Sequence, residues 1–181
     1  MQIQNNPWSF VSTDPATAAI TAATGLTLNT DGTVTITSAA LTFNPGADSA
    51  LAFTVLGAAA PVYNGFYTLQ QGVSGGTTFR MIPNFSIPAG TAQSGSGTLA
   101  QVLYRHKVRV EDISWQNTAS AAETAGETIL IVDRNGNDIW RSVLPATPTP
   151  LAQLNRGKLY WVSGLTPITI AANTEVLVTV N

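Results

Sequence analysis

The chain has 181 residues with 8 Lys and Arg, 10 Asp and Glu and 1 His, and its formal net charge is −2 at pH 7. Charged residues make up 10% of it against roughly 25% in ordinary soluble domains, and such a surface gives no broad attraction for nucleic acid or an anionic membrane. The absence of cysteine excludes disulfide bonds, thiolate nucleophiles and cysteine-based metal sites.

Residues 1–20 begin with "MQIQNNPWSF", which lacks the basic and apolar regions of a secretory signal. No later stretch reaches the roughly 18 apolar residues of a membrane span. We expect these residues to form an N-terminal arm, with Pro7, Trp8 and Phe10 as contacts to a partner. The protein is then expected to be made and used without export.

Residues 21–104 are predicted to form a β-sandwich or barrel domain. In "TGLTLNTDGTVTITSAALTF" apolar residues alternate with Thr on both sides of Asp31 and Gly32, which predicts a β-hairpin turning at these two residues. "SALAFTVLG" reads as a further strand. "PVYNGFYTLQQ" places Asn64 and Gly65 between aromatic residues, and we expect a two-residue type I′ turn there.

Residues 105–181 are predicted to form a second β-domain. "ETILIVDRNGNDIWRSV" indicates a hairpin with a type I′ turn at Asn135 and Gly136, and "KLYWVSGLTPITI" and "EVLVTV" supply closing strands. Residues 14–23 and 117–126 are the best helix candidates, although neither has an apolar stripe. The fold is therefore predicted to be all-β, with one or two small antiparallel sandwich or barrel domains joined by short hairpins.

No pattern of catalytic or metal-binding residues is visible. His106 is the single histidine and has no predicted catalytic partner, which favours a structural or interface role. "DRNGND" resembles a calcium loop superficially, but its Gly falls too early and the bidentate Glu is missing. We expect no enzymatic activity, no metal and no cofactor.

Arg105, Lys107 and Arg109 are three of the eight cationic residues, and strand alternation places them on one face. One interpretation is a solvated face paired with carboxylates such as Glu111 or Asp112. The other is a stripe that contacts an acidic neighbour in an assembly.

Trp115, Trp140 and Trp161 all lie in predicted strands of the last third of the chain. Buried core residues or subunit contacts are the common use of such aromatics, and a carbohydrate-stacking platform is the alternative. Depletion of charge further favours packing against copies of the same chain. We expect an oligomer.

"APVYNGFYTLQQGVSGGTTFRMIPNFSIPAG" resembles a module that recurs in virion proteins of tailed bacteriophages, including head fibres, decoration proteins and tail-fibre segments. "VEDISWQNT", "AGETILIVDRNGNDIW" and "WVSGLTPITIAANTEVLVTV" are similar to a compact β-domain of small phage structural proteins. Together these stretches fall within residues 50–181.

The resemblance implies a β-protein displayed on a virion, commonly as a trimer, that is assembled in the host cytoplasm. We expect a non-enzymatic capsid decoration or cement protein that binds the major capsid protein or another virion protein. A tail-fibre, head-fibre or baseplate component and a carbohydrate-binding adhesin module are the alternatives.

Overall fold

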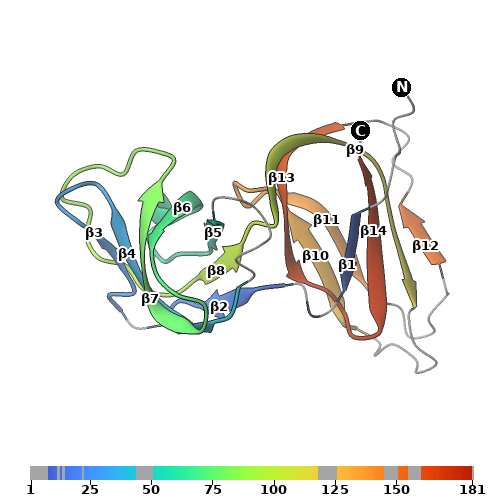
Figure 1. The fold of residues 1–181 in the computed structure, drawn as a ribbon, viewed down its shortest axis with the longest axis horizontal. Helices are drawn as coiled ribbons and strands as arrows, with labels where there is room; N and C mark the ends of the chain where they lie inside the picture. The colour runs from blue at the N-terminus through green and yellow to red at the C-terminus, as the bar shows by residue number, and fades with distance from the viewer. Residues whose placement is uncertain are drawn as a thin grey trace.

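The computed structural model describes residues 8–11, 13, 15–21, 23–43, 51–117, 126–144, 151–154 and 160–180. Within this part of the chain there is no α-helix, and the strands form two antiparallel seven-stranded sheets (Figure 1). Each sheet surrounds a hydrophobic cluster of its own. The all-β prediction is confirmed, and each sheet with its own core is described below as one domain.

The first domain is built on a sheet with the order β2-β8-β5-β6-β7-β4-β3. Its strands are β2 Thr17–Ala19, β3 Leu26–Leu28, β4 Val34–Leu41, β5 Ala52–Leu56, β6 Gly65–Gln71, β7 Gly76–Pro83 and β8 Thr98–Gln101. A single turn of 3-10 helix, η1 Pro61–Tyr63, lies between β5 and β6.

The two ends of this first sheet approach each other. Ile20, directly after β2, forms an antiparallel bridge with Ser38 of β4, and the Thr21 amide donates to the Thr37 carbonyl at 3.1 Å. These bonds join one edge of the sheet to a strand near the other edge, so the sheet curls into a nearly closed barrel. Closure of this kind covers edge backbone groups that would otherwise be available to other strands.

Aromatic side chains fill the first core. Phe43, Phe53 and Phe79 pack with ring centroids 5.4 to 6.4 Å apart, within the range of favourable aromatic pairs. Tyr63 and Tyr67 are fully buried, and both hydroxyls are satisfied because Tyr63 donates to the Ala92 carbonyl and Tyr67 to the Tyr63 carbonyl. Burial raises the pKa of the Tyr67 phenol well above its ordinary value.

The second domain is built on a sheet with the order β1-β14-β9-β13-β10-β11. The remaining strand, β12, also pairs with β9, but with a later part of that strand than β13 does. Its strands are β1 Trp8–Val11, β9 Tyr104–Asn117, β10 Thr128–Val132, β11 Asp138–Val143, β12 Leu151–Leu154, β13 Tyr160–Thr169 and β14 Thr174–Val180. Its core contains buried side chains from six of these strands.

Strand β9 is 14 residues long and contains a bulge. Val110 pairs with Val180 and Asp112 with Thr179, so Glu111 is an extra residue on β9. The bulge shifts the alternation, because the buried positions are Val110 before it and Ile113 after it. A single long strand can therefore bend around the second core.

The first domain is inserted into the second. Residues 8–11 pair with β14 at the other end of the chain, with Trp8 opposite Val178, and β2 then begins the first domain. Figure 1 shows β1 beside β14 in the second domain. The described part of residues 1–20 thus supplies one strand to each sheet, whereas an N-terminal arm was expected there. The chain re-enters the second domain at β9, which begins at Tyr104, next to the expected division after residue 104.

The predicted hairpins at residues 24–43 and 127–143 are confirmed, but the turn at Asn135 and Gly136 is not type I′. Asn135 does not have a positive φ, whereas Gly136 has φ +89°, and the Gly136 amide donates to the Asp133 carbonyl. This is a type I turn followed by a glycine bulge. The turn at Asp31 and Gly32 has the same pattern, with Gly32 at φ +82°.

The type I′ turn expected at Asn64 and Gly65 is wrong. Asn64 has φ −69° and follows η1, and Gly65 is the first residue of β6. The Asn64 side chain instead accepts a hydrogen bond from the Ala58 amide at 2.8 Å, which ties η1 to the end of β5. The helix expected at residues 14–23 is also wrong, since β2 lies there; residues 118–125 of the other candidate lie outside the described residues.

Candidate functional site

The outer face of β9 and β13 carries the only predicted contact residues that the structure shows to be accessible. Trp161 lies directly opposite Arg109 in the strand register, and Ser163 lies opposite Lys107. Residues directly opposite each other share a face of the sheet. Trp161, Lys107 and Arg109, which we call the outer-face patch, are therefore gathered by strand pairing.

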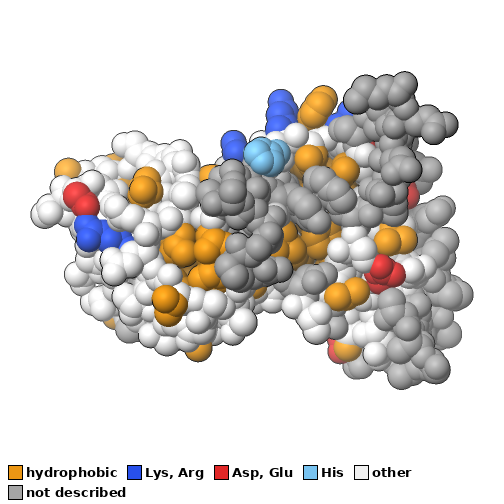
Figure 2. Space-filling view, viewed as in Figure 1, with side chains coloured by type: hydrophobic (Ala, Val, Ile, Leu, Met, Phe, Trp, Pro, Cys, Tyr) orange, Lys and Arg blue, Asp and Glu red, His pale blue; other side chains and the backbone are white. Residues whose placement is uncertain are grey.

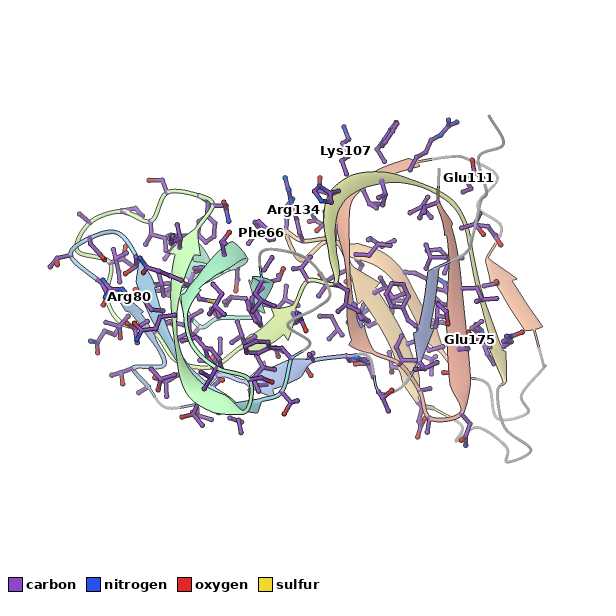
Figure 3. All side chains as sticks on the ribbon, in the orientation of Figure 1. Phe66, Arg80, Lys107, Glu111, Arg134 and Glu175 are labelled. Carbon is purple, nitrogen blue, oxygen red and sulfur yellow. The ribbon has the colours of Figure 1, made fainter. Side chains whose placement is uncertain are left out.

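Exposure and charge distinguish this patch from its surroundings. The Trp161 side chain is 61% exposed, Lys107 is exposed and Arg109 is half-buried. The Lys107 ammonium lies 5.4 Å from the centroid of the Trp161 ring, a cation–π contact that orients both side chains. Figure 3 shows Lys107 projecting from β9, and Figure 2 shows few charged side chains on the rest of this view of the molecule.

Three other predicted contact residues are core residues. Phe10 is 1% exposed, Trp115 is 1% exposed and Trp140 is 3% exposed, and all three belong to the second core. They cannot contact a partner, because their surface is already covered within the chain. Pro7 lies outside the described residues, as do the side chains of Trp8 and Arg105.

His106 is exposed at the start of β9, while Val108 and Val110 on its side of the strand pack into the core. On the other side of the strand Lys107 is exposed and Arg109 is half-buried. No group of three or more His, Asp or Glu residues in the described part of the chain could hold a metal ion. In the same residues no helix is long and apolar enough to cross a membrane.

Two carboxylates are held ionised by hydrogen bonds. Glu175 of β14 accepts from the Ser9 hydroxyl of β1 and from the Gln116 amide of β9 at 2.7 Å, and these bonds lower its pKa. The hydroxyl and amide of Thr33 lower the pKa of Asp31, which also accepts from Arg80. Glu175 therefore joins three strands, and Asp31 joins its turn to β7.

We expect acid to destabilise the fold partly through Glu175. A carboxylate whose pKa is lower in the folded state stabilises the protein above its unfolded pKa, and this contribution is lost as pH falls through the folded value. The Glu175→Gln variant should therefore lose less stability between neutral pH and about pH 3 than the parent protein. Urea unfolding at a series of pH values measures this, and an identical loss in both proteins would contradict it.

Comparisons of the chain with protein families, with curated proteins and with solved structures find no match. The outer-face patch and the fold are therefore interpreted on their own chemistry.

Proposed function

We propose that the protein is a non-enzymatic structural component of a tailed-bacteriophage virion, and that it decorates and stabilises the capsid surface. The proposal is supported by the resemblance of residues 50–181 to phage structural modules and by the low charge of the chain. The observation that carries it is the outer-face patch, in which exposed Trp161 lies opposite Arg109 and in contact with Lys107 on a pair of hydrogen-bonded strands.

The patch has the composition of a protein contact. Tryptophan and arginine are the residues most enriched among those that dominate binding energy at interfaces. The two cations around Trp161 favour a partner surface with acidic groups, since complementary charges fix register and speed association. We propose that the partner is the capsid shell, and that copies of the chain associate as a homotrimer on it.

Trp161→Ala is expected to weaken binding to capsids about tenfold or more, because loss of a central aromatic contact costs about 2 kcal/mol or more. The measurement is co-sedimentation of the purified protein with capsids that lack it. Val73→Ala is the matched control, since Val73 is a 71% exposed apolar residue of the first domain, away from the patch. Binding should also weaken as salt is raised.

Full capsid binding by Trp161→Ala would contradict the role of the patch, and absence of binding by the parent protein would contradict the capsid assignment. Localisation on the tail of intact particles by cryo-electron microscopy would favour a fibre or baseplate component instead. Native mass spectrometry tests the trimer separately, and a monomer at every concentration would contradict it.

A further inference from the structure

A pocket of about 450 Å³ lies where the two domains meet, and none of the three residues of the outer-face patch lines it. Its volume is within the range of ordinary small-molecule sites. Its wall comes from three separate segments, namely the start of β6, the chain after β7 and the turn between β10 and β11. The side chains that line it are those of Asn64, Phe66, Asn84, Phe85, Arg134 and Asn135.

The contact between the domains fixes the shape of this pocket. Between the domains, the Thr54 hydroxyl donates to the Arg134 carbonyl at 2.7 Å. Within the second domain, the Arg134 amide donates to the Ser163 carbonyl at 2.9 Å. Gly136 lies so close to β5 that an added Cβ would be 2.3 Å from a methyl carbon of Leu56. The β10–β11 turn therefore packs on the first domain, and these contacts position one wall of the pocket.

Two phenylalanines supply apolar walls. The centroid of the Phe66 ring lies 5.2 Å from the guanidinium carbon of Arg134. The Arg134 side chain of the second domain therefore contacts the first domain (Figure 3). Phe85 packs edge-on against Tyr67 with centroids 5.2 Å apart. Both rings are half-buried, so part of each remains accessible.

Three neutral amides complete the lining. The Asn64 oxygen accepts from Ala58, so Asn64 offers its NH₂ group to a ligand. The Asn84 NH₂ group donates to the Thr68 hydroxyl at 3.2 Å, so Asn84 offers its oxygen. Asn135 is exposed at the middle of its turn and can offer both. No carboxylate is among the described residues that line the pocket.

We propose that this junction pocket binds a neutral saccharide. A sugar ring presents vicinal hydroxyls, each a donor and an acceptor, beside apolar C–H faces. Amide groups match the hydroxyls and phenyl rings match the C–H faces. Anionic ligands would instead call for several cations, and the lining holds one.

The proposal does not depend on the virion assignment, because it involves other residues. It also predicts a coupling, since a ligand that contacts Asn64 and Asn135 bridges the two domains. Binding should therefore add to the contacts that hold the two domains together.

Saturation-transfer NMR with the full chain provides the test. The probes are the methyl glycosides of glucose, galactose, mannose and N-acetylglucosamine, together with methyl glucuronide as an anionic probe. We expect at least one neutral glycoside to bind with a Kd in the millimolar range. Asn135→Ala should weaken that binding about fivefold, the effect of losing one or two hydrogen bonds.

Gln71→Ala is the matched control, because it removes an exposed amide that does not line the pocket. Asn84→Ala serves as a second pocket variant, and unchanged thermal unfolding shows that each variant is folded. Failure of all four neutral glycosides to bind, binding of the glucuronide alone, or equal binding by the parent and both pocket variants would each overturn the proposal.

Discussion

Gly65→Val is expected to destabilise the first domain by about 3 kcal/mol or more. Gly65 has φ +142°, a conformation that residues with a side chain rarely adopt. An added Cβ would also lie 2.7 Å from a ring carbon of Phe85, which is held by Tyr67. The two costs add, because moving Phe85 away does not relieve the backbone strain. Urea unfolding followed by tyrosine and tryptophan fluorescence measures the loss.

Gly90→Ala separates the two costs. Gly90 has φ +78°, but no atom lies within 4 Å of an added Cβ. Its replacement should therefore cost only the backbone term of about 1 kcal/mol. Equal stability of Gly65→Val and the parent protein would show that Gly65 does not have a positive φ beside Phe85.

Trp115→Ala is expected to cost about 3 to 5 kcal/mol, the usual range for removing a buried aromatic side chain. Trp115 is 1% exposed and belongs to the second core, whose other buried side chains include residues of five further strands. Trp161→Ala should change stability by less than about 0.5 kcal/mol, because most of its surface is already in water. Thermal and urea unfolding of the two variants form a matched pair.

The pair tests the division between core and contact residues. If Trp161→Ala destabilised the protein as much as Trp115→Ala, the outer-face patch would be part of the fold and unavailable to a partner. If instead Trp115→Ala melted like the parent, the second core would be wrongly assigned.

Local pattern is enough to predict several of these features. The hairpin of β3 and β4 follows from alternation around a short turn, and its two strands are near neighbours in sequence. The inward position of Trp115 is also readable, because in "DISWQ" apolar residues alternate with polar ones. In "YWV" the residues on both sides of Trp161 are apolar, so no alternation predicts which of the three side chains points outward. The structure shows Val162 inside and Trp161 outside.

Other features depend on contacts that local sequence does not contain. Asn-Gly pairs predict type I′ turns. At Asn135, however, the Asp133 carboxylate accepts hydrogen bonds from the backbone amides of Asn135 and Asn137 and so stabilises a type I turn. At Asn64 the decisive contact is with Ala58. The junction pocket depends on segments more than 50 residues apart in the chain, such as Phe66 and Arg134. No spacing in the sequence indicates that they meet.

The pairing of β1 with β14 has a consequence for the order of events during synthesis. Val178, the strand partner of Trp8, is synthesised only after all the residues of the first domain and most of the second. The first domain can close its barrel as soon as β8 has been made, whereas β1 must wait as an unpaired strand until β14 appears. We therefore expect ribosome-bound chains truncated before β14 to carry a folded first domain and a protease-sensitive β1.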